Sequence, residues 1–476
     1  MMIGLDDNKQ AGLRQRFDDL APDRGFWKSK NRYYYREQDR FLKFLIPEGA
    51  SVLELGCGTG ESLNAVKPRH GVGVDFSAGM LDIARKQFPH LHFRRENIER
   101  LQFWGETFDF IILVDVIGHL LDVEEAFNRL RPFCKATTRV IISYYNFFWE
   151  PVLKAAEKLG LKMPEGIQNW LSPEDISGLL SLADLEVVKS EYRFLMPVRI
   201  PFVSNLVNRH LASLPLVRNL CLCRYFVARP LKLRERNQYA VTILIPCRNE
   251  KDNIEPAVRR IPGFGQSQEI IFVEGHSTDG TADEIRRVSG QYPEKNISLL
   301  FQDGRGKGDA VRKGFDAAAG DVFMILDADL TVPPEDLPRF YKALVNDHGE
   351  FINGCRLVYP MEKEAMRFAN LLGNKFFSMA FTWIFNQRFK DTLCGTKVLY
   401  RTDYERIKKD RGYFGELDPF GDFELIFGAV KQNLKIIEIP IRYRERTYNT
   451  TNIKRFRHGW LLLKMTVRAY LKIKAV

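Results

Sequence analysis

The chain has 476 residues, of which 45% are hydrophobic and 28% are charged, and its formal net charge is +11. This composition excludes a disordered protein, and the length exceeds what one hydrophobic core usually holds, so we predict two domains. The seven cysteines are odd in number and match no zinc-binding spacing, which favours a reducing compartment over a disulfide framework.

The first predicted elements form an alternation of strands and helices. Residues 51–60, SVLELGCGTG, predict a buried strand that runs into a glycine turn, where backbone N–H groups can approach a ligand closely. Further strands are expected at GVGVD, which ends at Asp75, at FDFIILVD, which ends at Asp115, and at residues 139–144, 185–194 and 225–229. This order indicates a doubly wound α/β sheet.

The glycine turn, Asp75 and FDFIILVD in this register resemble the class I S-adenosylmethionine-dependent methyltransferases over about residues 30–230. The resemblance implies a Rossmann-like domain over residues 1–230 with S-adenosylmethionine as its cofactor. It implies that Glu54, Gly56 and Gly58 bind the methionine part and that Asp75 binds the ribose. It also implies that Asn97 and Ile98 flank the adenine and that Asp115 lies near the methyl group. An NAD enzyme is the structural alternative, but the glycine spacing is G-x-G-x-G and not G-x-G-x-x-G.

Methyl transfer depends on positioning and desolvation, so a general base is optional. His119 follows the strand that ends at Asp115 and is the candidate for this catalytic role; the alternative is a histidine that caps a helix or packs in the core. Residues 147–170 are rich in Trp, Phe and Leu, which predicts either an acceptor wall or plain core.

Residues 231–238 are charged and lack an apolar period, so we place a linker there and a second domain at 239–476. In this domain VFMILDAD predicts a strand that ends in Asp327 and Asp329. Two carboxylates at one spot suit a hard divalent cation, Mg²⁺ or Mn²⁺, whose open positions are filled by nucleotide phosphates. A solvated loop is the alternative for an isolated D-x-D motif.

Three segments in order, VTILIPCRNE, EIIFVEGHSTDGT and VFMILDAD, resemble the family 2 glycosyltransferases with a GT-A fold, over about residues 239–460. DTLCGTK resembles the branch that makes polyprenyl-phosphate sugars. The resemblance implies a catalytic role for Asp422 of FGDFEL, metal binding by Asp327 and Asp329, and substrate binding by a larger set: Pro246, Glu250, Glu274, Asp279, Lys307, Asp327, Arg446, Asn452 and Arg455. Gly275 and His276 depart from the family pattern, which usually carries a second acid there.

Positive charge gathers in two stretches. Residues 193–236 contain nine Arg or Lys and one acid, and residues 435–476 contain eleven and two. Apolar residues at near-helical spacing accompany both, which predicts helices on an anionic membrane face; helices docked on their own domain are the alternative. No base-stacking motif accompanies the charge, so no nucleic acid is expected. No signal-peptide pattern or run of about twenty apolar residues is present, so we expect peripheral attachment on the cytoplasmic side.

Together these motifs predict a bifunctional enzyme. One half transfers a methyl group from S-adenosylmethionine, with O-methylation of a sugar or lipid-linked sugar expected, and the other transfers a glycosyl group from a nucleotide-diphospho-sugar to a polyprenyl-phosphate or glycan acceptor. The alternative is a nucleic-acid-binding or scaffold methyltransferase whose second domain only binds.

Overall fold

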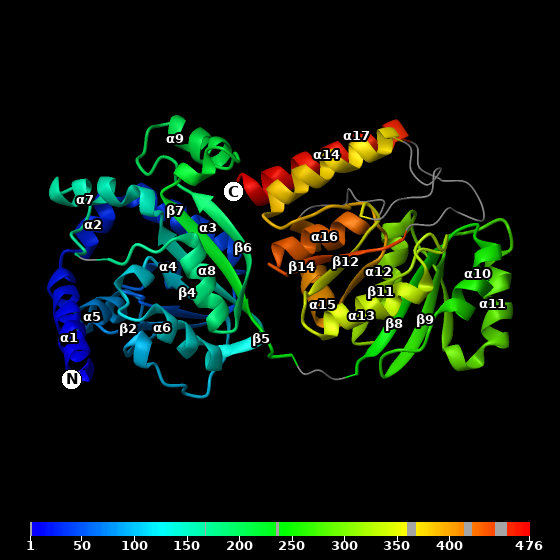
Figure 1. The fold of residues 1–476 in the computed structure, drawn as a ribbon, viewed down its shortest axis with the longest axis horizontal. Helices are drawn as coiled ribbons and strands as arrows, with labels where there is room; N and C mark the ends of the chain where they lie inside the picture. The colour runs from blue at the N-terminus through cyan, green and yellow to red at the C-terminus, as the bar shows by residue number, and fades with distance from the viewer. Residues whose placement is uncertain (1, 167, 235–237, 359–367, 414–420, 443–454) are drawn as a thin grey trace. The chain divides into compact units, whose positions relative to one another are not determined.

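The computed structural model describes residues 2–166, 168–234, 238–358, 368–413, 421–442 and 455–476. Internal contacts divide the chain into two units, Met1–Leu233 with Ala475–Val476, and Arg234–Lys474. Each unit is built on a seven-stranded sheet (Figure 1). This architecture confirms the predicted α/β class with two domains.

The sheet of the first unit has the strand order β3-β2-β1-β4-β5-β7-β6. Its strands are β1 Ser51–Leu55, β2 His70–Asp75, β3 His92–Arg95, β4 Phe108–Val114, β5 Cys134–Tyr145, β6 Leu185–Arg193 and β7 Cys223–Pro230. The first five strands run parallel, whereas β7 is antiparallel to both β5 and β6. All five residues of β1 are buried, as expected for a parallel sheet that is covered on both faces.

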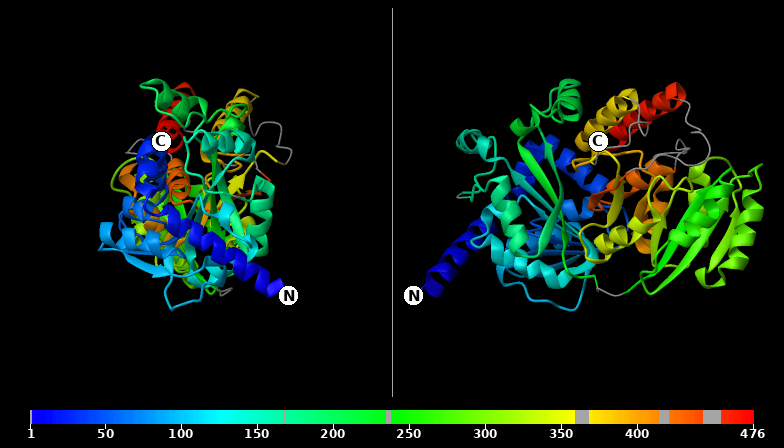
Figure 2. Two further views of the ribbon diagram at one scale, coloured as in Figure 1. Left: turned by 90° about the vertical axis from the view of Figure 1, so that its left-hand side faces the viewer. Right: turned by 45° about the vertical axis from the view of Figure 1, so that its right-hand side comes forward.

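Helices lie on both faces of this sheet (Figure 2). They are α1 Met2–Leu20, α2 Arg24–Lys30, α3 Arg32–Leu45, α4 Glu61–Ala65, α5 Ala78–Gln87, α6 Val123–Leu130, α7 Glu150–Lys158, α8 Pro173–Leu182 and α9 Val203–Leu206. Short turns of other helix types occur at η1 Ile98–Arg100, η2 Ile117–His119, η5 Val207–Leu211 and η6 Arg218–Leu220. Local capping explains several starts: Ser77 accepts from Met80 N at α5, and Ser172 forms a capping box with Asp175 at α8.

The sheet of the second unit has the order β10-β9-β8-β11-β13-β12-β14. Its strands are β8 Ala240–Cys247, β9 Ser267–Glu274, β10 Ile297–Phe301, β11 Val322–Ile325, β12 Phe351–Cys355, β13 Lys397–Tyr400 and β14 Ile436–Pro440. Strands β8 to β11 run parallel, and β13 is antiparallel to β11 and β12. The parallel part carries the motifs on which the prediction of a nucleotide site rests.

The helices of the second unit are α10 Lys251–Arg260, α11 Thr281–Gln291, α12 Lys307–Ala317, α13 Leu337–Val345, α14 Phe368–Phe385, α15 Arg401–Lys409, α16 Asp422–Lys431 and α17 Arg455–Ala469. Helix α17 packs along α14 and continues into a π-helical turn, η10 Tyr470–Lys474. Within the described ranges no helix is both long and apolar enough to cross a membrane.

Gly320 marks a close backbone approach just before β11. A Cβ atom there would lie 2.6 Å from Thr242 Oγ1 and 2.7 Å from Thr242 N. The N–H of Gly320 donates to the same hydroxyl at 3.1 Å and to Glu269 Oε1 at 3.1 Å. Because a side chain would push against the backbone of β8, only glycine fits without a shift of the strand.

We therefore expect Gly320→Ala to lower the free energy of unfolding of the second unit by about 1–3 kcal/mol, the usual cost of overpacking. Gly290→Ala is the matched control, because Gly290 lies on the exposed side of α11 and a Cβ atom there would have no neighbouring atom within 4 Å. That control should be neutral or stabilising by up to about 1 kcal/mol. Urea unfolding followed by circular dichroism measures both; equal stability of the two variants would contradict the assigned packing.

Candidate active sites

One pocket of the first unit lies where β1, β2 and β4 end. The residues that line it include all those predicted to bind the cofactor, together with the predicted catalytic histidine: Glu54, Gly56, Gly58, Asp75, Asn97, Ile98, Asp115 and His119. With its solvent-open mouth the pocket holds about 1100 Å³ of empty space. This space is sufficient for a nucleoside with a short side chain.

The glycine turn after β1 presents bare backbone to this pocket. Gly56 has a φ of 72°, and a Cβ atom there would overlap Val116 Cγ2, so no side chain fits. Gly58 has a φ of 51°, and the N–H of Gly58 donates to Asp75 Oδ2 at 2.8 Å. Apart from Gly58 itself and its two chain neighbours, no atom of the described residues lies within 4 Å of the position that a Cβ atom of residue 58 would take. The turn therefore leaves room for a ligand to approach the main chain.

Two buried carboxyl groups face the same pocket. Asp75 also accepts from Ser77 N at 2.9 Å, and burial raises its pKa although these N–H groups act to lower it. Burial raises the pKa of Glu54 to about 8. Within the described part of the chain Glu54 Oε2 is buried and has no hydrogen-bond partner. An ammonium or hydroxyl group of a ligand would satisfy this oxygen, so the site fits an amino-acid-bearing nucleoside such as S-adenosylmethionine.

Asp115, which directly follows β4, is hydrogen-bonded to two side chains of helix α3. Its carboxylate accepts from Ser143 Oγ at 2.6 Å, from Tyr34 OH at 2.7 Å and from Gln38 Nε2 at 2.8 Å. The backbone of Asp115 is left-handed, with a φ of 54°. Asp115 therefore lines the pocket while its side chain holds the covering helix in place.

The remaining predicted cofactor residues lie at η1. Asn97 caps this turn by accepting from Glu99 N at 2.9 Å, and Ile98 is buried. Glu99 in turn accepts from Gln10 Nε2 of α1 at 2.7 Å. Helix α1 is thus connected to the part of the pocket where the sequence predicts the adenine.

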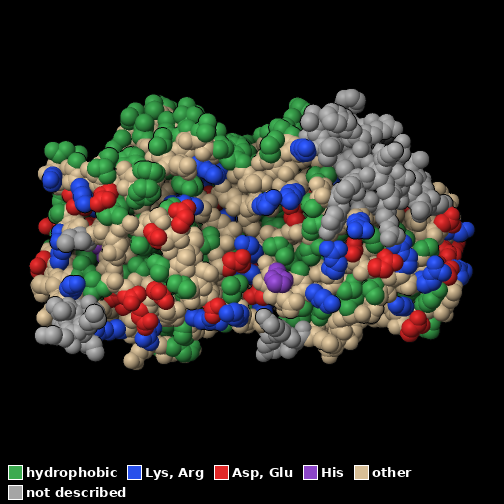
Figure 3. All heavy atoms as spheres, viewed as in Figure 1, with side chains coloured by type: hydrophobic (Ala, Val, Ile, Leu, Met, Phe, Trp, Pro, Cys, Tyr) green, Lys and Arg blue, Asp and Glu red, His purple; other side chains and the backbone are tan. Residues whose placement is uncertain are grey.

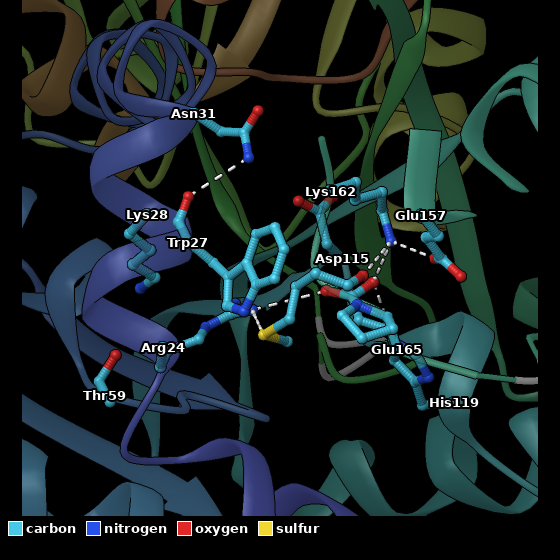
Figure 4. A network of polar contacts seen from close by, with 12 residues as sticks. Arg24, Trp27, Lys28, Asn31, Thr59, Asp115, His119, Glu157, Lys162 and Glu165 are labelled. Atoms are coloured by element: carbon cyan, nitrogen blue, oxygen red, sulfur yellow. Dashed lines mark hydrogen bonds and ion pairs between the residues drawn. The ribbon is translucent and has the colours of Figure 1, made fainter. Parts of the chain in front are cut away.

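His119, at the end of η2, belongs to a buried ionic network (Figure 4). His119 Nε2 lies 3.8 Å from Glu165 Oε2. Glu165 is held by Lys162 Nζ at 2.7 Å and by Arg24 Nη1 at 3.5 Å, and Lys162 also pairs with Glu157 at 2.8 Å. The network joins α2 to the segment that follows α7.

The charges in this network determine the protonation states. Burial would raise the pKa of Glu165, but the charges of Lys162, His119 and Arg24 outweigh it and lower that pKa to about 2. Burial lowers the pKa of His119 from 6.5, and the charge of Glu165 opposes this shift only in part. In the described structure His119 Nδ1 is buried and has no hydrogen-bond partner. At neutral pH the pocket therefore contains a carboxylate beside a neutral imidazole that can accept a proton.

Several pocket residues were not predicted from the sequence: Arg24, Lys28, Tyr35, Gln38 and Glu165. Arg24 and Lys28 stand four residues apart and so share one face of α2, which is the signal that could have indicated them. Glu165 has no comparable signal, because its partners lie in α2, in η2 and in its own loop.

In the second unit, the residues predicted to surround the nucleotide base and ribose lie at the ends of β8 and β9 and in the loops that follow them. Pro246 is in β8, one residue before Cys247, which pairs with Glu274 of β9. Glu274 is buried and accepts from the N–H groups of His276 at 3.0 Å and Ser277 at 2.6 Å. Its carboxylate therefore shapes the turn that follows β9.

Glu250 and Asp279 meet at the start of α11. The N–H of Glu250 donates to Thr281 Oγ1 at 3.0 Å, and the same hydroxyl donates to Asp279 Oδ1 at 2.5 Å. Asp279 also accepts from Lys251 N at 3.2 Å. The loops after β8 and β9 are thereby linked into one edge of the sheet.

A second ionic cluster lies beside the D-x-D motif. Lys307 Nζ is 2.6 Å from Asp327 Oδ1 and 3.6 Å from Asp422 Oδ1. Lys397, which the sequence did not indicate as a site residue, is fully buried and lies 3.7 Å from the same Asp422 oxygen. Burial would raise the pKa of Asp327, but Lys307 outweighs it and lowers that pKa.

Two glycines explain why this cluster can form. Gly421 precedes α16 with a φ of 73°, and a Cβ atom there would lie 2.7 Å from Gly308 Cα. The main chain at the start of α16 is therefore in direct contact with the main chain of the first turn of α12. Since Lys307 and Asp422 begin these two helices, they are brought within reach of each other.

The metal site predicted at the D-x-D motif has two carboxylates with different contacts. Asp327 pairs with Lys307, whereas Asp329 accepts from the N–H of Thr331 at 3.1 Å and from its hydroxyl at 2.8 Å. In the described part of the chain no three His, Cys, Asp or Glu side chains gather as a metal site. A divalent cation takes about six oxygen ligands, so phosphate and water would have to complete its shell.

Three predicted substrate residues cannot be placed in either site. Arg446 and Asn452 lie outside the described residues. Arg455 is the first residue of α17, and its side chain is not described.

Comparisons with known proteins agree with this division. Residues 26–190 match a family described as methyltransferase domain, and residues 242–407 match glycosyl transferase family 2. A dolichol-phosphate mannosyltransferase of Pyrococcus furiosus is 30% identical over 219 residues, which cover 45% of this chain and 59% of that protein. An undecaprenyl-phosphate 4-deoxy-4-formamido-L-arabinose transferase of Edwardsiella ictaluri is 31% identical over 107 residues, which cover 22% of this chain and 33% of that protein.

Solved structures are similar to each half. A possible histamine N-methyltransferase of Thermotoga maritima is 19% identical with a TM-score of 0.37, and covers 46% of this chain and 99% of its own. Glucosyl-3-phosphoglycerate synthase of Mycobacterium tuberculosis, solved with Mn²⁺ and UDP, is 14% identical with a TM-score of 0.37, and covers 49% and 80%.

The chain therefore joins a methyltransferase domain of Rossmann-like fold to a family 2 glycosyltransferase domain of GT-A fold. Both are families of enzymes, as the sequence predicts. The chain spans little more than half the length of the mannosyltransferase that it matches.

The ionic network leads to a test of the state of His119. We expect Glu165→Gln to lower the pKa of the His119 imidazole, because the anion that favours the protonated ring is lost while Lys162 and Arg24 remain. Glu157→Gln is the matched control, since Glu157 pairs with Lys162; it should move this pKa less. NMR titration, with the signal assigned through His119→Gln, measures the pKa. A rise in the Glu165→Gln variant would contradict the network.

Proposed function

We propose that the first unit transfers a methyl group from S-adenosylmethionine to a hydroxyl group of a sugar or lipid-linked sugar. The observation that carries this proposal is that one pocket brings together Glu54, the glycine turn, Asp75 and His119. S-adenosylmethionine supplies an electrophilic methyl group when bound. Glu54 Oε2, Asp75 and the bare turn at Gly58 would hold it.

His119 acts as general base in this proposal. A hydroxyl acceptor must lose its proton as its oxygen is methylated, and the neutral imidazole of His119 would take that proton at its unprotonated ring nitrogen. Glu165, held ionised by Lys162 and Arg24, then stabilises the imidazolium. Because His119 can accept a proton, a hydroxyl acceptor, which must lose one, suits this pocket better than an acceptor that has no proton to lose.

We propose that the second unit transfers a glycosyl group from a nucleotide-diphospho-sugar to a polyprenyl-phosphate or glycan acceptor. The cluster of Lys307, Asp327 and Asp422 supports this proposal, because it puts one cation and two carboxylates at the carboxyl edge of the sheet. Two relatives have names that contain dolichol phosphate and undecaprenyl phosphate, which supports a polyprenyl acceptor.

The roles within this cluster follow from charge. Lys307 would face the negative diphosphate of the donor, and Asp422 would act as base or as orienting charge for the acceptor. Asp327 and Asp329 would hold Mg²⁺ or Mn²⁺, which when bound neutralises the leaving diphosphate. Pro246, Glu250, Glu274 and Asp279 would border the base and ribose.

We also propose that the chain binds peripherally to the anionic cytoplasmic face of a membrane. Helix α17 supports this, because its exposed side includes Trp460, Val467 and the basic residue Lys464. Lys472, in the turn that follows, is also exposed. Lys474 does not belong to this surface, since it is buried and donates to Asn386 Oδ1 at 2.7 Å.

The methyl-donor site has a direct test. The chain should bind S-adenosylhomocysteine with micromolar or better affinity, roughly 8 kcal/mol. Asp75→Ala should weaken this binding by at least about tenfold, or about 1.4 kcal/mol, because contacts to the ribose are lost. Asp82→Ala on the exposed side of α5 is the control. Calorimetry that detects NADH binding but none of S-adenosylhomocysteine would refute the methyltransferase assignment.

The sugar-donor site requires both aspartates in this proposal. A calorimetric screen of UDP-, GDP- and TDP-sugars, with and without Mn²⁺ or Mg²⁺, would first identify the nucleotide. Asp327→Asn and Asp329→Asn should then each abolish metal-dependent binding of it and leave S-adenosylhomocysteine binding unchanged, because one carboxylate holds the cation weakly. Asp336→Asn, at a surface pair with Arg339, should have no effect. Full sugar transfer by the unaltered chain in EDTA would disprove the metal-dependent mechanism.

A further inference from the structure

We infer that residues 194–222 of the methyltransferase unit form a lipid-docking surface that inserts apolar side chains into an anionic membrane. This segment connects β6 to β7, two antiparallel neighbours in which Arg193 pairs with Cys223. A two-residue turn can join such strands. Residues 194–222 are therefore not required to connect β6 to β7, which suggests that the segment serves another purpose.

The segment presents apolar side chains to solvent. Phe202 is 91% exposed and Leu216 is 93% exposed. The other exposed apolar residues of the segment are Val198, Ile200, Val203, Leu206, Leu211, Leu214 and Leu220. Figure 3 shows apolar side chains gathered over α9, the helix at the centre of this segment. Single exposed leucines are ordinary on protein surfaces, but a continuous group of this kind marks an interaction site.

Polar contacts on its inner side hold the segment in this orientation. Ser204 is buried, donates to Val198 O at 2.7 Å and accepts from Ile200 N at 2.7 Å. Asn208 makes two hydrogen bonds to the main chain of Met196, at 2.9 and 2.8 Å. The segment therefore buries the hydroxyl of Ser204 while it leaves large apolar side chains such as Phe202 and Leu216 in solvent, an exposure that water disfavours.

Neighbouring elements fix the segment to the pocket wall. Asn146 Nδ2 donates to Asn219 O at 2.7 Å and to Cys221 O at 3.1 Å. Asn146 directly follows Tyr145, which lines the methyl-donor pocket. Trp149 Nε1 donates to Leu220 O at 2.9 Å and so connects the start of α7, where Phe148 is also exposed. Hydrogen bonds thus connect the docking surface to the wall of the pocket.

The charge of the segment identifies an anionic membrane as the occupant. No Asp or Glu occurs between Glu191 and Glu235, whereas Arg199 and Arg209 are exposed beside the apolar group. Phenylalanine and leucine flanked by arginine is the composition of elements that lie at a lipid–water interface. This inference deepens the proposed membrane attachment by assigning a second, apolar contact to the methyltransferase unit, and it does not depend on the identity of either substrate.

Salt separates this contact from the electrostatic attachment proposed for α17. At about 1 M salt, where screening acts within about 3 Å, binding through charge alone is lost while apolar insertion persists. The full chain should therefore float with vesicles of phosphatidylcholine and phosphatidylglycerol at low salt and keep part of this binding at high salt. Lys464→Glu/Arg468→Glu/Lys472→Glu should reduce only the salt-sensitive part.

The deciding variant is Phe202→Ser/Leu216→Ser. Its partition into vesicles at high salt should fall at least about tenfold, equivalent to about 1.4 kcal/mol. Leu182→Ser is the matched control, because Leu182 of α8 is 67% exposed outside the segment. A Phe202→Trp variant should show a blue-shifted emission that is quenched by brominated lipid. Circular dichroism and S-adenosylhomocysteine binding should remain unchanged in all of them, which excludes misfolding.

Three outcomes would overturn the inference. The double serine variant could float at high salt as well as the unaltered chain, or tryptophan at position 202 could stay unquenched by brominated lipid. Sedimentation could also show a dimer that the double variant loses without any change in flotation, which would make the surface an interface between two copies. Failure of methyl or sugar transfer with persistent flotation would instead reject the proposed function and leave this surface intact.

Discussion

Parallel strand pairing is the constraint on which both candidate sites depend. In each unit one central strand, β1 or β8, lies between two parallel neighbours, so all three strands end at the same edge of the sheet. Crossover helices cover both faces, which leaves the carboxyl edge as the place where a ligand can reach the main chain. Gly56, Asp75 and Asp115 meet at this edge although they are distant in the sequence.

Charged side chains are buried or half-buried at these edges, and they pair with charges from other segments. An unpaired buried ion costs several kcal/mol, so pairing connects the elements that supply the two charges. Glu165 connects the loop after α7 to Arg24 of α2, and Lys307 connects α12 to Asp327 after β11. The N-terminal helices therefore become part of the pocket wall through electrostatics as much as through packing.

The methyltransferase unit combines a charged interior site with an apolar exterior segment. Both arrangements reverse the usual distribution of polar and apolar groups, and both lie at the end of β5, where Tyr145 lines the pocket and Asn146 holds the segment. An acceptor with a polar head and a hydrocarbon tail would find partners for each part at this place. This combination is the physical reason to propose a lipid-linked sugar as the methyl acceptor.

The sequence alone determined the strands and the residues that follow them. Gly56, Asp75 and Asp115 in the first unit and Asp327 in the second stand directly after apolar runs, so local hydrophobic pattern and glycine spacing were enough to place each at the carboxyl edge of its own sheet. Only the tertiary structure decided which charges are buried and which apolar groups are exposed. Glu165 and Lys397 resemble any surface charge in the sequence, and the sequence leaves open whether the apolar residues around Phe202 face a membrane or their own domain, because burial depends on contacts between residues far apart in the chain.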